Sequence, residues 1–214
     1  MGITGDISYF YPLFFLAVIA GVTLLAIVLH ELGHCLFALA CGYRVSNLKL
    51  FRLSVSFGRG VVSLSCNNSG VKGQCLVFDR DGLYGKKAGL TVLGGSLFNL
   101  FAGLLGMSPL FAGVGLYGLT MWMSFSVMNL FFAVSNLIPR GCNDGATFAE
   151  IRRFGSENYN KLMNIASARE LGQSLCEMDP VWFVPSAVGG SMAVELRGLR
   201  SEKKMQEKGY RFKK

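Results

Sequence analysis

One apolar stretch, residues 10 to 40, limits the folds open to this chain more than any other feature. It exceeds the roughly 20 apolar residues that a helix needs to cross a bilayer. The stretch nevertheless contains His30, Glu31 and His34, which include both histidines of the chain. Ionisable side chains are costly inside a membrane and usually serve a function there. We therefore expect a membrane helix that carries a functional site in its second half.

Residues 30 to 34 read His-Glu-Leu-Gly-His, the H-E-x-x-H pattern of zinc peptidases. At 3.6 residues per turn, His30 and His34 lie on one helix face and can present two neutral imidazoles to one ion. Glu31 would act as the catalytic base toward a zinc-activated water. The alternative is an accidental match, which would leave the Glu31 carboxylate without a role in hydrocarbon.

A catalytic zinc site needs a third protein ligand besides its open position. No histidine remains, because Ala40 stands where a longer version of the pattern has its third histidine. Asp144 follows the last apolar stretch and is expected on the same side of the membrane as the two histidines. It is the first candidate, and Cys142 is the second. The alternative for Asp144 is an ordinary turn or helix cap.

Composition and charge indicate a membrane protein, since 51% of the residues are hydrophobic and 16% are charged. Residues 88–107 and 110–139 form two further stretches long enough to span a bilayer. None of the 21 lysines and arginines lies in residues 1–43; eight lie in 44–87 and thirteen in 140–214. The positive-inside rule places the N-terminus outside and both basic regions in the cytosol.

These features predict an integral protein of a bacterial-type plasma membrane, with its site in the cytosolic half of the bilayer. This distribution explains the net charge of +8 by membrane topology and contact with anionic lipid. We therefore expect no nucleic-acid partner. The first apolar stretch lacks the basic start of a signal peptide and is too long for one. The six cysteines form no C-x-x-C pair, so we expect no disulfide framework.

Residues 45–78 predict a small antiparallel sheet on the cytosolic side. Apolar residues alternate through 48–57, and two more strands are expected at 61–66 and 71–78, with turns near 67–70 and 79–82. Two interpretations remain open for this sheet. It is a solvated surface hairpin without a role, or its exposed edge holds an extended substrate by main-chain hydrogen bonds.

The second apolar stretch contains a polar amide, Asn99, at a depth similar to that of His30. Asn99 either makes an interhelical hydrogen bond or orients the substrate carbonyl and its oxyanion. Gly94, Gly95 and Gly103 are expected to serve helix packing, because small residues let membrane helices approach closely.

Taken together, these motifs resemble the site-2 protease family of intramembrane zinc metalloproteases. That family combines H-E-x-x-H with a G-x-x-x-N element, here Gly95 to Asn99, and an N-L-[LI]-P segment, here residues 136–139. A D-G pair follows, here Asp144-Gly145. The resemblance covers residues 20 to 150 approximately. It implies that His30, His34 and Asp144 bind one catalytic Zn²⁺, that Glu31 is the base and that Asn99 binds substrate.

The chain departs from the family pattern at three places. Ser96 stands where the family often has proline, residues 141–143 replace a proline-rich approach to Asp144, and Ala146 replaces a second glycine. These departures leave the inferred ligands unchanged. They affect the expected geometry of the loop around Asp144.

We therefore expect an α-helical integral membrane protein with three core transmembrane helices and a small membrane-associated antiparallel sheet on the cytosolic side. Residues 1–145 would form the protease core and 146–214 a helical, basic C-terminal region, without PDZ-like or nucleotide-sensing domains. An amphipathic helix is expected over 156–178, and a mobile basic tail from Arg197.

The resemblance implies a zinc-dependent endopeptidase that hydrolyses peptide bonds in transmembrane segments of substrate proteins, in regulated intramembrane proteolysis. Its partners would be a transmembrane protein substrate and the lipid bilayer. The alternatives are a catalytically silent membrane binder of the same fold and a metal carrier.

Overall fold

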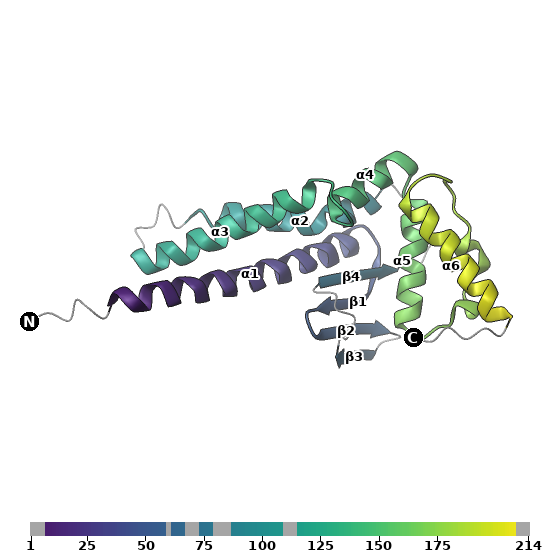
Figure 1. The fold of residues 1–214 in the computed structure, drawn as a ribbon, viewed down its shortest axis with the longest axis horizontal. Coiled ribbons are helices and arrows are strands. Elements are labelled where there is room, and N and C mark those ends of the chain that lie inside the picture. The colour runs from purple at the N-terminus through teal and green to yellow at the C-terminus, as the bar shows by residue number, and fades with distance from the viewer. Residues whose placement is uncertain (1–6, 59–60, 67–72, 79–86, 109–114, 209–214) are drawn as a thin grey trace, which may run out of the picture.

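A computed structural model describes residues 7–58, 61–66, 73–78, 87–108 and 115–208. Three long helices lie together at one end of the molecule, and a sheet with further helices lies at the other (Figure 1). The long helices are apolar enough to cross a membrane: α1 (Ile7–Ala40), α2 (Ala88–Leu105) and α3 (Leu116–Leu137). Their positions confirm the three apolar stretches expected from the sequence, apart from residues 109–114, which lie outside the described chain.

Helices α1 and α2 cross closely because glycines remove side chains from their contact. A Cβ atom at Gly33 would lie 2.6 Å from the Gly94 carbonyl oxygen and equally close to the Cβ of Phe98. A Cβ at Gly94 would lie 2.7 Å from the Cβ of Phe37. Gly94 therefore does serve helix packing, as expected, and together with Gly33 it sets how near α2 approaches the histidines of α1.

The sheet has four antiparallel strands in the order β3-β2-β1-β4. The strands are β1 (Arg44–Leu50), β2 (Leu53–Gly58), β3 (Val61–Cys66) and β4 (Gly73–Phe78). The expectation of one strand over 48–57 was wrong, because a two-residue turn at Phe51 and Arg52 divides it. Phe51 has a φ of 54°, and Leu50 pairs with Leu53 across the turn. The turns expected near 67–70 and 79–82 lie outside the described residues.

The sheet has one apolar and one polar face. Leu53, Phe57, Val62 and Leu64 alternate along β2 and β3 on the apolar face, and all four are exposed. On the other face, Asn47 donates hydrogen bonds to serines of β2. The paired strands thus leave an apolar surface that the described part of the chain does not cover.

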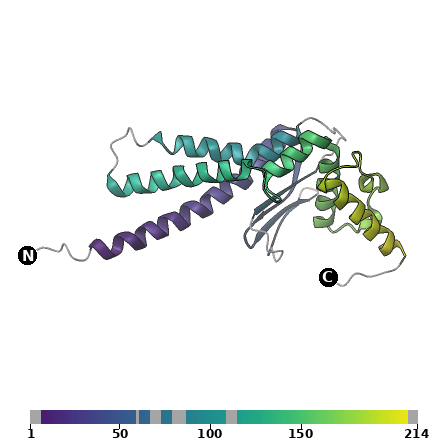
Figure 2. The ribbon, with the colours of Figure 1, turned by 45° about the horizontal axis from the view of Figure 1, so that its top comes forward.

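Three helices follow in the C-terminal region, and the middle one packs against the strands (Figure 2). They are α4 (Asp144–Phe154), α5 (Glu157–Glu170) and α6 (Ser191–Glu207), with short 3₁₀ turns η2 (Leu175–Glu177) and η3 (Pro180–Phe183) between the last two. Ser167 of α5 donates to the Val77 carbonyl of β4 at 2.9 Å, and Glu170 of α5 forms an ion pair with Lys49 of β1. One buried cluster contains residues from both sides of position 145, and the expected domain boundary there stays a prediction.

Two expectations for this region were wrong. The helix expected over 156–178 ends at Glu170, because Gly172 adopts a φ of 84° and the amides of Gly172 and Gln173 turn back to α5 carbonyls. The tail expected to be mobile from Arg197 belongs to α6 as far as Glu207. Lys203 fixes this helix by donating to the Met178 carbonyl at 2.5 Å.

Candidate metal centre and its cavity

Two histidines of α1 and a distant aspartate of α4 converge where the long helices adjoin the sheet. The Nε2 atoms of His30 and His34 lie 3.2 Å apart. The Asp144 Oδ2 lies 3.1 Å from the first and 3.4 Å from the second. Tetrahedral zinc with bonds of roughly 2.0–2.1 Å would separate its ligand atoms by about 3.3 Å. The three donor atoms therefore fit the ligand set of one ion, and they are the group in the described chain able to hold a metal.

Neighbouring groups orient two of these ligands. The Nδ1 of His34 lies 2.9 Å from the Thr91 carbonyl of α2, which accepts its proton and leaves Nε2 free to bind metal. Ser96, also on α2, donates from its hydroxyl to Asp144 Oδ2 at 3.3 Å. Ser96 is one of the departures from the family pattern, and in this chain it holds the carboxylate. The buried Nδ1 of His30 has no hydrogen-bond partner in the described part of the chain.

Gly95 supports the two imidazole rings. A Cβ atom at this position would lie 2.6 Å from the Nε2 of His34 and 2.7 Å from the Cε1 of His30. The sequence predicted only helix packing for Gly95. Any side chain at position 95 would therefore displace the two imidazole rings.

Asp144 is held by a helix cap. Asn143 accepts a hydrogen bond from the Ala146 amide at 3.0 Å and so caps α4, which begins at Asp144. The Asn143 amide also donates to the carbonyls of Ser135 and Ile138 at 3.1 and 2.7 Å. The capping alternative is therefore true of Asn143, and the same cap places Asp144 beside the histidines.

The electrostatics of Asp144 suit a metal ligand. Burial raises the pKa of its carboxyl group, but the hydrogen bonds and charges of His30 and His34 outweigh burial and hold this pKa well below its usual value. The carboxylate therefore stays ionised at neutral pH.

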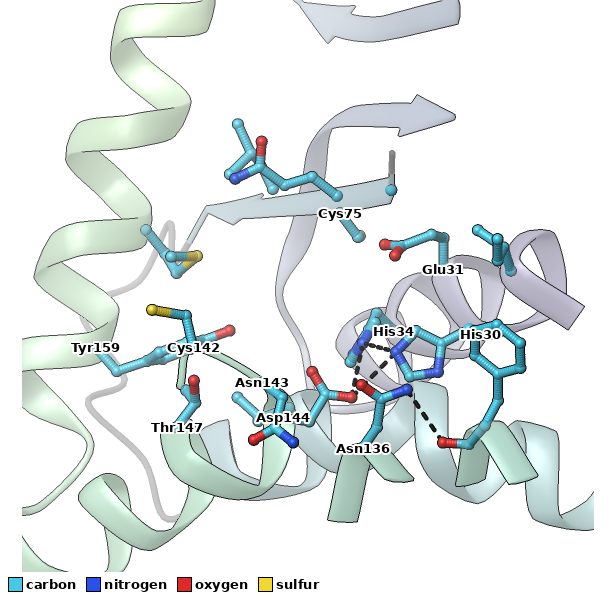
Figure 3. Close-up of a pocket in the computed structure, with 17 residues that line it drawn as sticks. His30, Glu31, His34, Cys75, Asn136, Cys142, Asn143, Asp144, Thr147 and Tyr159 are labelled. Atoms are coloured by element: carbon cyan, nitrogen blue, oxygen red, sulfur yellow. Dashed lines mark hydrogen bonds and ion pairs between the residues drawn. The ribbon is translucent and has the colours of Figure 1, made fainter. Parts of the chain in front are cut away.

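A cavity of about 490 Å³ opens beside the three ligands (Figure 3). Glu31 lines it together with the ligands, and its carboxylate projects toward β4. Residues 73–76 of β4 form the opposite wall. Within the described sheet β4 pairs only with β1, so its other edge has no strand partner among the described residues.

Several cavity residues were not identified from the sequence. Asn136 of α3 lines the cavity. In the sequence, it was marked only by its place in the N-L-I-P segment. Tyr159 and Met163 reach the cavity from α5, and no sequence pattern indicated them. Tyr159 points from α5 toward the cavity interior (Figure 3), and burial raises the pKa of its hydroxyl.

The remaining candidates lie in different places. Cys142 lines the cavity but does not belong to the group of donor atoms. Asn99 is fully buried and does not line the cavity, and neither of its amide atoms has a hydrogen-bond partner among the described residues. Its substrate-binding role stays a prediction.

A pair of thiols lies next to Glu31. The Sγ atoms of Cys35 on α1 and Cys75 on β4 are 2.9 Å apart. Their hydrogen bond, together with burial, raises the pKa of the Cys75 thiol, which therefore keeps its proton at neutral pH.

Comparison of the chain with protein-family models, curated proteins and solved structures gives no match. The assignment of the site therefore rests on its own residues and geometry.

Proposed function

We propose that this protein is an intramembrane zinc metalloprotease of the site-2 protease type, which hydrolyses peptide bonds in transmembrane segments of other proteins. The observation that carries the proposal is the convergence of His30, His34 and Asp144 in a cavity that also contains Glu31. Two imidazoles and one carboxylate are the ligand set of many catalytic zinc sites. The same cavity lies at the ends of three helices long and apolar enough to span a bilayer.

Each residue has a chemical task in this proposal. His30, His34 and Asp144 would hold zinc, which when bound supplies a Lewis acid that polarises a carbonyl and lowers the pKa of water. Glu31 removes the proton from the attacking water and delivers it to the leaving amine. Asn136 and Tyr159 carry donors that line the cavity and can bind a substrate carbonyl.

The free edge of β4 accounts for how a substrate would be held. A transmembrane helix shields its carbonyl groups, so the cleaved segment must unwind before attack. An extended segment can pair with the main chain of residues 73–76, which form the cavity wall. This supports the substrate-binding interpretation of the sheet over that of a solvated hairpin.

The apolar sheet face supports a membrane setting for the site. Leu53, Phe57, Val62 and Leu64 are exposed on one surface, which would be unfavourable in water and suits the bilayer interface. With the distribution of basic residues, we propose a bacterial-type plasma membrane, an outside N-terminus and a cytosolic C-terminus.

Cleavage of a single-pass reporter tests the proposal. The reporter is a leucine-rich span with an Asn-Pro pair near its cytosolic end, reconstituted with the purified protein in liposomes. We expect wild type to cleave within the span and Glu31→Gln to keep its zinc and lose cleavage. Glu195→Gln, an exposed change on α6, is the matched control and should cleave normally.

The two alternatives give different results. A silent binder would retain the reporter in a pull-down with wild type and with Glu31→Gln alike, and neither would cleave it. A metal carrier would transport zinc into sealed vesicles. Cleavage by Glu31→Gln at the wild-type rate would refute the proposed mechanism.

A further inference from the structure

The two sulfur atoms beside the base form a candidate modification site that the proposed chemistry does not use. We propose that Cys35 and Cys75 form a reversible disulfide when exposed to a hydroperoxide, and that this bond switches off the neighbouring site. The switching part of the inference rests on the proposed protease function, whereas the thiol chemistry does not.

The two thiols lie on the helix that carries Glu31, α1, and on the strand beside it, β4. Cys35 follows Glu31 by four residues on α1, so both side chains lie on one helix face. Cys75 follows Gly73 by two residues on β4, so these two residues share one face of the strand. A Cβ atom at Gly73 would contact the Glu31 carboxyl group directly. A bond between the two sulfurs would therefore tie β4 to α1 next to the catalytic base.

The distance between the sulfurs suits bond formation. They lie 2.9 Å apart, and a disulfide requires about 2.05 Å, which a small movement of β4 toward α1 provides. The four other cysteines have no such partner among the described residues. Cys66, Cys142 and Cys176 are exposed and Cys41 is half-buried.

The oxidation balances with a hydroperoxide as the oxidant. One sulfur attacks the terminal peroxide oxygen, the O–O bond breaks, and an S–OH group forms while water or an alcohol leaves. The second sulfur then displaces the hydroxyl group, which departs as water and takes the second thiol proton. Two thiols thus lose two electrons and two protons, and a small dithiol reverses the reaction by exchange.

The oxidant reaches the thiol pair at Cys75. This residue lines the cavity, whereas Cys35 is buried at 9% exposure. Disulfides that form in the cytosol are usually transient and redox-sensing, which agrees with a site on that side of the membrane.

Disulfide mapping tests the thiol chemistry without any protease assay. The full-length protein in liposomes is treated with hydrogen peroxide, quenched with acid, alkylated and digested for mass spectrometry. We expect a peptide that joins Cys35 to Cys75, and its loss after treatment with dithiothreitol. Cys142→Ser, which removes another cavity thiol, should leave the cross-link intact, whereas Cys75→Ser should abolish it.

A wild-type protein that gives no peptide joining Cys35 to Cys75 would overturn the inference, and this result depends on no variant folding correctly. Zinc content, measured in parallel, reports whether Cys75→Ser keeps its fold. If Cys75→Ser loses zinc, Cys35→Ser replaces it as the variant that lacks the pair.

Reporter cleavage then tests the switch. Because a displacement of about 1 Å can reduce catalysis roughly 100-fold, we expect oxidation to lower wild-type cleavage about 10- to 100-fold and dithiothreitol to restore it. Cys75→Ser should cleave equally before and after peroxide. Equal cleavage by reduced and cross-linked wild type would refute the switch and leave the protease proposal standing. A cross-link in a protein that never cleaves would refute the protease proposal and with it the switch, but not the thiol chemistry.

Discussion

Gly73 of β4 lies so close to Glu31 of α1 that a Cβ atom at position 73 would contact the carboxyl oxygen, Cδ and Cγ of the glutamate. The strand therefore limits the positions open to the Glu31 carboxylate. Gly73→Ala should displace the Glu31 carboxylate and lower reporter cleavage by about 10- to 100-fold. The zinc content should not change, because the three atoms nearest to that Cβ all belong to Glu31 and not to a ligand. Reporter cleavage and zinc content are measured on one preparation.

Gly198→Ala is the control for Gly73→Ala. Gly198 lies in α6 with open space around its would-be Cβ, so this change should leave cleavage intact. A Gly73→Ala protein with wild-type cleavage would mean that the Glu31 carboxylate need not occupy its position against the strand.

Gly95→Ala should weaken metal binding. The new methyl group would approach the Nε2 of His34 at 2.6 Å, so the imidazoles must move away from the shared ligand position. We expect zinc affinity to fall at least about 10- to 100-fold, measured by competition with a chelator. Unchanged affinity would show that the rings bind metal from another orientation.

Ser96→Ala should weaken zinc binding through Asp144. The lost hydroxyl no longer donates to the carboxylate, and such outer contacts are worth about 10- to 100-fold in metal affinity. Ser126→Ala is the matched control, since Ser126 is equally buried and donates to the Gly103 carbonyl instead. If both variants bind zinc equally, the Ser96 hydrogen bond does not orient Asp144.

Tyr159→Phe should reduce cleavage and leave zinc in place. The hydroxyl remains a neutral donor because burial raises its pKa, and one such hydrogen bond contributes about 1 kcal/mol, or roughly fivefold in rate. The loss should persist up to about pH 10, where an ordinary tyrosine begins to ionise. Cleavage by Tyr159→Phe at the wild-type rate would exclude this hydroxyl from substrate binding.

The sequence was most informative where function depends on local spacing. His30 and His34 share a helix face by their separation alone, and Asp144 follows from the end of the third apolar stretch. The convergence of these three residues agrees with that interpretation. The length and apolar character of the three helices were likewise predictable from composition.

Features that depend on tertiary packing could not be predicted. Tyr159 reaches the cavity because α5 packs on the sheet, and Cys35 meets Cys75 because β4 lies against α1. The division of the first expected strand depended on the left-handed conformation of Phe51, which a bulky residue seldom adopts. Sequence periodicity contains no information about such contacts.

The most direct test of the account is the number of zinc ions per chain in detergent-purified wild type, Glu31→Gln and Asp144→Ala, measured by elemental analysis. We predict about one zinc in wild type and in Glu31→Gln, and none in Asp144→Ala, because a catalytic zinc requires three protein ligands. Retention of zinc by Asp144→Ala would contradict the assigned ligand set and direct attention to Cys142. Absence of zinc from wild type reconstituted with the metal would contradict the metal centre itself.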